Sequence, residues 1–364
     1  MKLLLVFGTR PEAIKMCPIV KELEKQQNIE YKVCLTGQHK EMISPILDAF
    51  GICEDYNLNI MKDNQSLVSI TADIITKLDC ILEVEGPDLV LVHGDTTSAM
   101  AAGLAAFYRR IPVGHVEAGL RTYNMDSPFP EEFNRQAIDL VTNMFFAPTI
   151  RAKENLIKEG KNPDKIFVTG NTAIDALRYT VNPTYTDENL EWASDSRLIL
   201  FTAHRRENIG KPMRDIFGAL IEIVKQNENV KVIYPVHKNP KVREIANELL
   251  NGNERIRLIE PLDVMKFHNY LKASFIIMTD SGGIQEEAPS LGVPVLVIRD
   301  TTERPEGIEA GTTKLIGVNC VNIIVEVNRL LADKTEYIKM TKVENPYGDG
   351  FAAKKIIEAI NHNF

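Results

Sequence analysis

The chain has 364 residues, of which 44% are hydrophobic and 25% charged, a composition that excludes disordered, collagen-like and coiled-coil proteins. At about 100–200 residues per domain, this length predicts two domains with a cleft between them. The net charge of −8 is opposite in sign to that of nucleic-acid-binding and membrane-surface proteins, so we expect neither as a partner.

Short apolar runs recur along the whole chain. The first, at residues 3–7, is too short for a secretory signal or a membrane span, so we expect a cytoplasmic protein. The others lie at residues 31–35, 89–92, 112–116, 144–146, 166–168, 198–201, 231–236, 275–278 and 294–298. Runs without polar alternation, separated by stretches of helical length, are typical of parallel strands buried on both faces. A polar stretch at 180–196 then indicates a connection between two doubly wound α/β sheets of similar size.

The first predicted strand is followed by Gly-Thr-Arg-Pro-Glu, in which Thr9 and Glu12 have the spacing of a capping box. A helix should therefore begin at the carboxyl end of this strand. Helix N-termini attract anions, and Arg10 and Lys15 add two cations that suit a phosphate or carboxylate. The alternative is a capped turn with solvated cations.

Three acidic residues lie where predicted strands end or a helix begins: Asp95, Glu117 and Glu131. Because the carboxyl ends of parallel strands share one edge, we expect these carboxylates to meet above one sheet and to perform acid–base chemistry. Singly, each is alternatively a helix cap or a surface charge. His93 beside Asp95 also suggests a metal site, but no third ligand has suitable spacing, so no metal is expected.

In the second half, Ser281, Gly282 and Gly283 follow the predicted strand at 275–278. Their backbone N–H groups and the Ser281 hydroxyl can donate to a diphosphate, and Glu287, about one turn later, suits a ribose diol. A glycine-rich turn with no ligand is the alternative interpretation.

Two further motifs bear on ligands. The cluster His204-Arg205-Arg206 ends the first strand of the second half and predicts a diphosphate clamp, although arginine pairs also occur on ordinary surfaces. The sequence at residues 348–353 formally matches the dinucleotide pattern G-x-G-x-x-A. It follows Asn-Pro rather than a predicted strand, so we expect no nicotinamide cofactor.

Six separated blocks together resemble the non-hydrolysing UDP-N-acetylglucosamine 2-epimerases: residues 8–15, 93–97, 115–134, 202–208, 280–288 and 300–306. The resemblance extends to the motif at 345–350. It implies two Rossmann-like doubly wound parallel-sheet domains of the glycosyltransferase-B-like type, an active site in the interdomain cleft, and a homodimer. The domains would be residues 1–170 plus the returning C-terminal helix at 348–364, and a UDP-binding domain at 171–347.

The resemblance also implies a reaction: reversible interconversion of UDP-GlcNAc and UDP-ManNAc, without metal or other cofactor, supplying ManNAc for bacterial surface polysaccharide. Anti elimination of UDP would give a 2-acetamidoglucal, to which UDP adds again after C2 is protonated on the opposite face. The residues that match UDP-contacting positions are Arg10, Phe267 near the uracil, Ser281, Gly282 and Gly283 at the phosphates, Glu287 at the ribose, and Arg304. The residues that match the active-site set are Lys15, Asp95, Glu117, Glu131 and His204. Which carboxylate is the acid and which the base stays open.

Bacterial members of this family often bind a second UDP-GlcNAc as an allosteric activator. The residues that resemble this second site are Gln38, Glu131, Arg205 and His237. Many relatives have a glutamine where this chain has Glu41 and an arginine where it has Asn64. A lost cation and an added acid disfavour tight binding of an anionic effector.

Three alternatives remain at this point. One is a glycosyltransferase of the same fold, which would need an acceptor but no acidic trio. A second is a catalytically silent sensor of UDP-sugars. The third is a 2-epimerase for another UDP-2-acetamido sugar.

Overall fold

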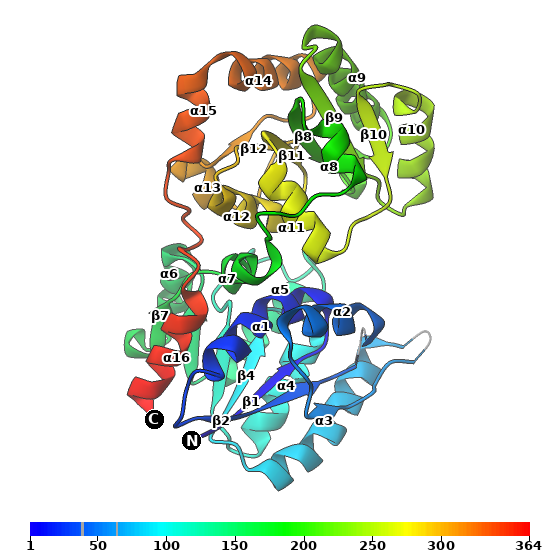
Figure 1. Ribbon diagram of the computed structural model, residues 1–364. Helices are drawn as coiled ribbons and strands as arrows, with labels where there is room; N and C mark the ends of the chain where they lie inside the picture. Colours follow the sequence, from blue (N-terminus) through cyan, green and yellow to red (C-terminus); the bar gives the residue numbers. More distant parts are fainter. Residues whose placement is uncertain (38–39, 63–64) are drawn as a thin grey trace. The chain divides into compact units, whose positions relative to one another are not determined.

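The computed structural model describes residues 1–37, 40–62 and 65–364. It divides into two compact units, of which unit 1 comprises Met1–Tyr179 and Gly348–Phe364, and unit 2 comprises Thr180–Tyr347. The first runs from blue to green and includes the red C-terminal helix in Figure 1; the second runs from green to orange. The sequence-based boundary at 170/171 falls just before helix α7 (Thr172–Thr180), most of which belongs to unit 1.

Unit 1 is built on a sheet that, within the described residues, has seven parallel strands in the order β3-β2-β1-β4-β5-β6-β7. The strands are β1 (Lys2–Phe7), β2 (Glu30–Leu35), β3 (Tyr56–Asn57), β4 (Leu89–His93), β5 (Val113–Val116), β6 (Met144–Ala147) and β7 (Ile166–Val168). The helices are α1 (Arg10–Leu23), α2 (Lys40–Phe50), α3 (Leu67–Glu85), α4 (Thr97–Tyr108), α5 (Glu131–Val141), α6 (Ile150–Lys158), α7, α16 (Ala352–Asn363) and the short 3₁₀ turn η1 (Pro163–Lys165).

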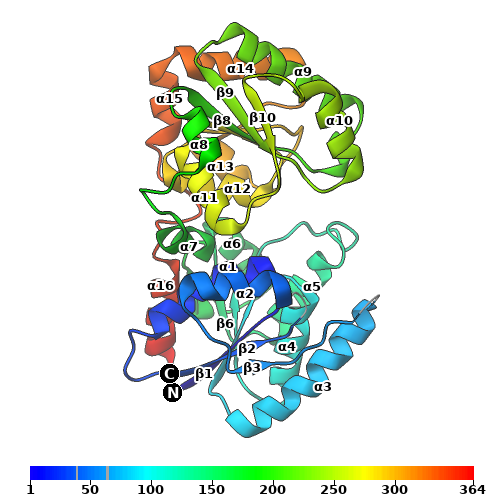
Figure 2. The same cartoon turned by 45° about the vertical axis from the view of Figure 1, so that its right-hand side comes forward.

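Helices cover the unit 1 sheet because its central strands are apolar on both faces. Leu4 and Val6 of β1 pack with Ile74 and Leu78 of α3 in one buried cluster, which also includes alanines of α4. Helices α1 and α2 pack against each other, and the C-terminal helix α16 returns to pack against α1 (Figure 2). Helix α16 therefore belongs to unit 1, although 168 residues of unit 2 precede the segment Gly348–Phe364 in the chain.

Unit 2 repeats this plan with, among the residues described, six parallel strands in the order β10-β9-β8-β11-β12-β13. The strands are β8 (Arg197–Thr202), β9 (Val230–Pro235), β10 (Ile256–Ile259), β11 (Ile276–Thr279), β12 (Val295–Val297) and β13 (Thr313–Leu315). The helices are α8 (Glu188–Ala193), α9 (Lys211–Gln226), α10 (Pro240–Leu250), α11 (Val264–Ala273), α12 (Gly282–Glu287), α13 (Pro305–Ala310), α14 (Cys320–Ala332), α15 (Lys334–Thr341) and the 3₁₀ turns η2 (Arg206–Asn208) and η3 (Ala288–Leu291).

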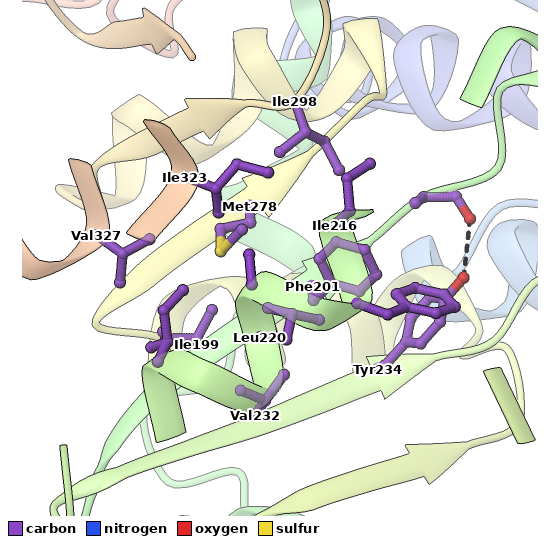
Figure 3. Close-up of a cluster of buried hydrophobic side chains, with 14 of the residues drawn as sticks. Ile199, Phe201, Ile216, Leu220, Val232, Tyr234, Met278, Ile298, Ile323 and Val327 are labelled. Atoms are coloured by element: carbon purple, nitrogen blue, oxygen red, sulfur yellow. Dashed lines mark hydrogen bonds between the residues drawn. The ribbon is translucent and has the colours of Figure 1, made fainter. Parts of the chain in front are cut away.

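A hydrophobic core of unit 2 lies between its sheet and helices α9, α10 and α14 (Figure 3). The rings of Phe201 and Tyr234 meet edge to face with centroids 4.6 Å apart. The buried Tyr234 hydroxyl donates a hydrogen bond of 3.0 Å to the carbonyl oxygen of Ala203. The core therefore fixes the backbone at the end of β8, directly before His204.

Sequence patterning located the buried strands closely. Each of the ten predicted apolar runs forms a strand whose ends differ from the expectation by at most one residue. In the described part of the chain, three strands have no counterpart among these runs: β3, β10 and β13, all of which lie at sheet edges. The dinucleotide-like pattern at 348–353 follows α15 and no strand, as expected, and its last two residues begin α16. Over the same described residues, no helix combines the length and the apolar character needed to cross a bilayer.

Candidate active site

Both sheets reverse their strand order at a central pair of strands, β1 and β4 in unit 1 and β8 and β11 in unit 2. Ligands of open α/β sheets bind outside the carboxyl ends of the strands at such a reversal, because the loops there diverge to opposite faces. Four of the predicted residues lie in the loops or helix starts that follow these strands: Arg10 after β1, Asp95 after β4, His204 after β8 and Ser281 after β11.

In unit 1, Glu12 links the loops that follow β1 and β4. Its Oε2 accepts the backbone N–H groups of Gly8 at 2.9 Å and Thr9 at 2.7 Å, and its Oε1 accepts the Thr96 hydroxyl at 2.5 Å. Burial raises the pKa of Glu12, while the hydrogen bond from Thr96 opposes that rise. The predicted capping box is confirmed, and it places Arg10 as the first residue of α1.

Glu117, directly after β5, has the most distinctive geometry in unit 1. Its φ of 68° is in the left-handed region, where a side chain other than glycine costs conformational energy. Its Oε2 forms an ion pair with Lys15 and accepts a 3.2 Å hydrogen bond from Asn171. His93 Nε2 lies 3.7 Å from the same oxygen, and burial lowers the pKa of His93 to about 3, so this imidazole is neutral. The arrangement combines a carboxylate, an ammonium group and a neutral imidazole.

Asp95 directly follows Gly94. A Cβ built on Gly94 would lie 3.8 Å from Oε1 of Glu117, so the carboxylate of Glu117 lies close to this glycine. The carboxylate of Asp95 forms an ion pair with Arg135 of α5, and the backbone carbonyl of Asp95 accepts a 2.9 Å hydrogen bond from Asn134. Helix α5 begins at Glu131, whose side chain is partly exposed. The structure thus brings Asp95 close to the first turns of the helix that Glu131 opens, at the same sheet edge as Glu117.

The neighbouring Glu132 has a different role from Glu131. It is fully buried, and its carboxylate accepts the backbone N–H groups of Thr122 and Tyr123 at 2.9 Å each. Burial alone would raise the pKa of Glu132, but these N–H groups and the Arg135 guanidinium lower it. Glu132 therefore fixes the loop before α5.

In unit 2, Asp280 organises the corresponding reversal point. Its Oδ2 accepts the backbone N–H groups of His204 and Arg205 at 2.9 Å each and the Asn208 amide at 3.1 Å. The other carboxylate oxygen lies 3.0 Å from Nδ1 of His204. Burial by itself would raise the pKa of this carboxyl, but the His204 imidazole and the two N–H groups outweigh it and lower the pKa. Asp280 thereby fixes the loop after β8 and presents the imidazole of His204, 40% exposed.

The predicted phosphate segment starts helix α12, for which Ser281 is the N-cap residue, although its hydroxyl makes no capping hydrogen bond. A Cβ on the buried Gly282 would lie 3.2 Å from Cζ of Arg304, so this glycine makes room for the guanidinium rather than only for a ligand. Arg304 also donates to Glu286 at 2.7 Å, whereas Gly283 is exposed. The segment and Arg304 therefore form one local site.

Glu287 ends α12 with its Oε2 3.4 Å from Nε2 of the buried His268, whose Nδ1 lies 2.7 Å from the Thr180 hydroxyl. Phe267, the preceding residue of α11, is partly buried against the unit 2 core. The predicted ribose and uracil residues thus lie near each other, because the side chains of Glu287 and His268 meet.

Of the residues predicted for the second site, Gln38 lies outside the described residues, as do Asn64 and the side chain of Glu41. The exposed imidazole of His237 stacks on His204 with ring centroids 5.6 Å apart. Burial, and secondarily the charge of His204, lower the pKa of His237. Arg205 donates to Glu303 at 3.1 Å.

Sequence reasoning assigned no role to Asn171, Arg135 or Asp280. Asn171 follows the predicted strand at 166–168, so the rule that polar residues gather at strand ends would have selected it. Arg135 lies four residues after Glu131 and shares a helix face with it. Across the described ranges, no three metal-binding side chains form a group that could hold an ion.

The chain is similar to known proteins in sequence and in structure. The family model described as UDP-N-acetylglucosamine 2-epimerase matches residues 21–361. The UDP-N-acetylglucosamine 2-epimerase of Bacillus subtilis (strain 168) is 55% identical over 360 residues, which cover 99% of this chain and 95% of that protein. The structure of S. aureus MnaA with UDP is 49% identical and has a TM-score of 0.90, covering 100% of this chain and 96% of that one. The UDP-GlcNAc 2-epimerase of Neisseria meningitidis bound to UDP-GlcNAc is 50% identical with a TM-score of 0.89, and all of both chains is covered.

Proposed function

Because the chain belongs to the UDP-N-acetylglucosamine 2-epimerase family, we propose that it interconverts UDP-GlcNAc and UDP-ManNAc by eliminating UDP and adding it back. The relatives whose structures contain UDP or UDP-GlcNAc support a UDP-sugar as the substrate. We propose further that the product supplies ManNAc for a bacterial surface polysaccharide.

The chemistry of the sugar explains why elimination is needed. The C2 proton is not adjacent to a carbonyl group, so a carboxylate cannot simply remove it and return it to the opposite face. Breaking the bond between C1 and the UDP oxygen develops positive charge at C1 and makes the C2 proton acidic. Loss of that proton gives a 2-acetamidoglucal and UDP; protonation of C2 from the other face and re-addition of UDP give the epimer.

The acidic cluster of unit 1 is the observation on which this proposal depends. Glu117 has a left-handed backbone conformation and forms an ion pair with Lys15. Asp95 follows the neighbouring strand β4 and forms an ion pair with Arg135. Inversion at C2 needs a base on one face and an acid on the other, and we assign these tasks to Asp95, Glu117 and Glu131.

Unit 2 supplies groups suited to UDP. The α12 N–H groups, Ser281, Arg304 and the imidazole of His204 can stabilise negative charge on the departing diphosphate. Glu287, with His268 against its carboxylate, suits the ribose hydroxyls. Arg10, at the start of α1 in unit 1, adds a further cation.

The direct test is incubation of UDP-GlcNAc with the protein in D₂O without an acceptor. An epimerase incorporates deuterium at C2 and forms UDP-ManNAc. A glycosyltransferase lacking its acceptor and a UDP-sugar sensor leave C2 protonated, so absence of exchange would refute the proposal. Parallel incubations with other UDP-2-acetamido sugars identify the preferred substrate.

We also propose a homodimer with weak activation by a second UDP-GlcNAc. The aromatic and aliphatic side chains of Phe107, Tyr108 and Leu140 are exposed and line one groove of unit 1, which supports association through this face. The weak activation rests on the replacement of an arginine by Asn64. Light scattering measures the molar mass and so tests the homodimer. Initial rates with UDP-ManNAc, with and without UDP-GlcNAc, test the activation.

A further inference from the structure

A buried network joins His115 of β5 to the segments that hold the proposed acids. The ring of His115 is fully buried, with Nδ1 2.7 Å from Oδ1 of Asp139 and Nε2 2.7 Å from the backbone carbonyl oxygen of Gly94. Asp139 also accepts a 2.6 Å hydrogen bond from Arg121, which donates two further bonds of 2.7 Å to Glu159.

Both partners of the His115 ring are hydrogen-bond acceptors. A backbone carbonyl oxygen cannot donate, and an ionised carboxylate cannot donate either. Oδ2 of Asp139 lies 2.6 Å from Nη2 of Arg121, whose guanidinium is always charged, so the Asp139 carboxylate is ionised independently of His115. A neutral imidazole has one N–H group and would leave a lone pair facing one acceptor at 2.7 Å. Only the doubly protonated ring satisfies both contacts.

The three segments that meet at this ring each contain one of the proposed acids. Gly94 directly precedes Asp95, and the ring contacts the carbonyl oxygen of the peptide bond that joins these two residues. His115 itself lies two residues before Glu117 on the same strand end. Asp139 lies on α5, the helix that begins at Glu131.

We propose that His115 is a positioning residue, held as an imidazolium ion, that fixes the relative placement of the three acidic side chains. This inference rests on the proposed function for its kinetic consequence. His115 touches no reacting group; it acts by clamping the peptide before Asp95 to the helix that Glu131 opens. A buried, fully satisfied network of this kind holds its members more rigidly than a solvated one.

The protonation state is tested on the unaltered protein by ¹⁵N NMR after selective labelling of histidine. We expect one ring whose two N–H protons are both present at pH 7–8 and exchange slowly with water, because His115 is buried. His115→Asn should remove these signals, and His362→Asn, at an exposed position of α16, should leave them. If no slowly exchanging histidine has two ring protons, the imidazolium assignment is wrong.

The positioning role is tested by the turnover of His115→Asn, expressed per UDP-binding site so that unfolded molecules are not counted. Displacement of catalytic groups by about 1 Å lowers turnover by about 10²-fold, and we expect a loss of that order with UDP affinity unchanged. His362→Asn should turn over normally. Equal turnover per UDP-binding site in His115→Asn and the unaltered protein would show that His115 only stabilises the fold, and would overturn the proposal.

The experiments distinguish failure of the proposed function from failure of the positioning role. If the unaltered protein incorporates no deuterium at C2, the proposed function fails, while the NMR experiment still decides the state of His115. If the unaltered protein exchanges C2 and His115→Asn exchanges it equally fast, the positioning role alone fails.

Discussion

Substitution of Glu117 separates the catalytic contribution of this residue from its conformational cost. The carboxylate pairs with Lys15 and accepts the Asn171 amide, so Glu117→Gln keeps the size of the side chain but removes its charge and basicity. General acid–base catalysis contributes about 10²–10⁴-fold, so kcat should fall by that factor, equivalent to about 3–5 kcal/mol of activation free energy. UDP affinity should change little, because the groups that suit UDP belong mainly to unit 2.

The backbone at Glu117 gives a second, independent expectation. A φ of 68° destabilises the folded state by about 1–2 kcal/mol for an L-residue with a Cβ, but not for glycine. Glu117→Ala and Glu117→Gly both lose the carboxylate, the ion pair and the hydrogen bond, so the difference between them isolates the backbone. After allowance for the greater entropy of glycine in the unfolded chain, the glycine variant should be more stable by about 1 kcal/mol.

Three measurements decide the case. Deuterium incorporation at C2, followed by ¹H NMR, gives turnover; calorimetry gives UDP affinity; urea denaturation gives the free energies of unfolding. Glu188→Gln, at an exposed position of α8, is the matched control and should behave as the unaltered protein. Turnover of Glu117→Gln within tenfold of the unaltered protein would refute the catalytic role. An alanine variant as stable as the glycine variant would refute the reasoning on strain.

Three further outcomes are expected. Asp95→Asn should lower turnover by about 10²-fold or more while UDP binding is retained, measured as for Glu117; near-normal kcat would remove Asp95 from the mechanism. Asp280→Ala leaves three donors without their partner: the partly buried backbone N–H groups of His204 and Arg205 and the buried Asn208 amide. At about 1–3 kcal/mol for each buried donor, the variant should be less stable by several kcal/mol at pH 7 in urea denaturation. Folding lowers the pKa of Asp280, so the stability that its carboxylate contributes is present above the unfolded pKa of about 3.9 and is lost as pH falls through the folded pKa. The difference in stability between the unaltered protein and Asp280→Ala should therefore narrow below about pH 4. A difference that stays constant with pH would contradict this. Gly8→Ala would place a Cβ 1.7 Å from Oγ1 of the buried Thr36, so we expect a loss of about 1–3 kcal/mol in the same assay, and no loss would show that the two strand ends can separate freely.

The amino-acid sequence by itself determined the features that depend on near neighbours and on burial. The capping box of Thr9 and Glu12 needs residues only three positions apart, and the structure contains both of its hydrogen bonds. The central strands are apolar on both faces, so their pattern identifies them. The edge strand Tyr56–Asn57 is two residues long and half buried, which leaves little pattern to recognise. The strand Ile256–Ile259 is likewise mostly half exposed.

Only the tertiary structure decided which side chains meet. Lys15 and Asn171 contact Glu117 from 102 and 54 residues away, and no local rule fixes such pairs. The left-handed backbone of Glu117 could not be predicted from the sequence either, because glutamate is not a residue type that favours a positive φ. Asp280 and His204 are 76 residues apart and meet because β8 and β11 are neighbours in the sheet. Strand order, which is set by how the whole sheet buries its apolar faces, therefore decided which of the distant side chains meet at the site.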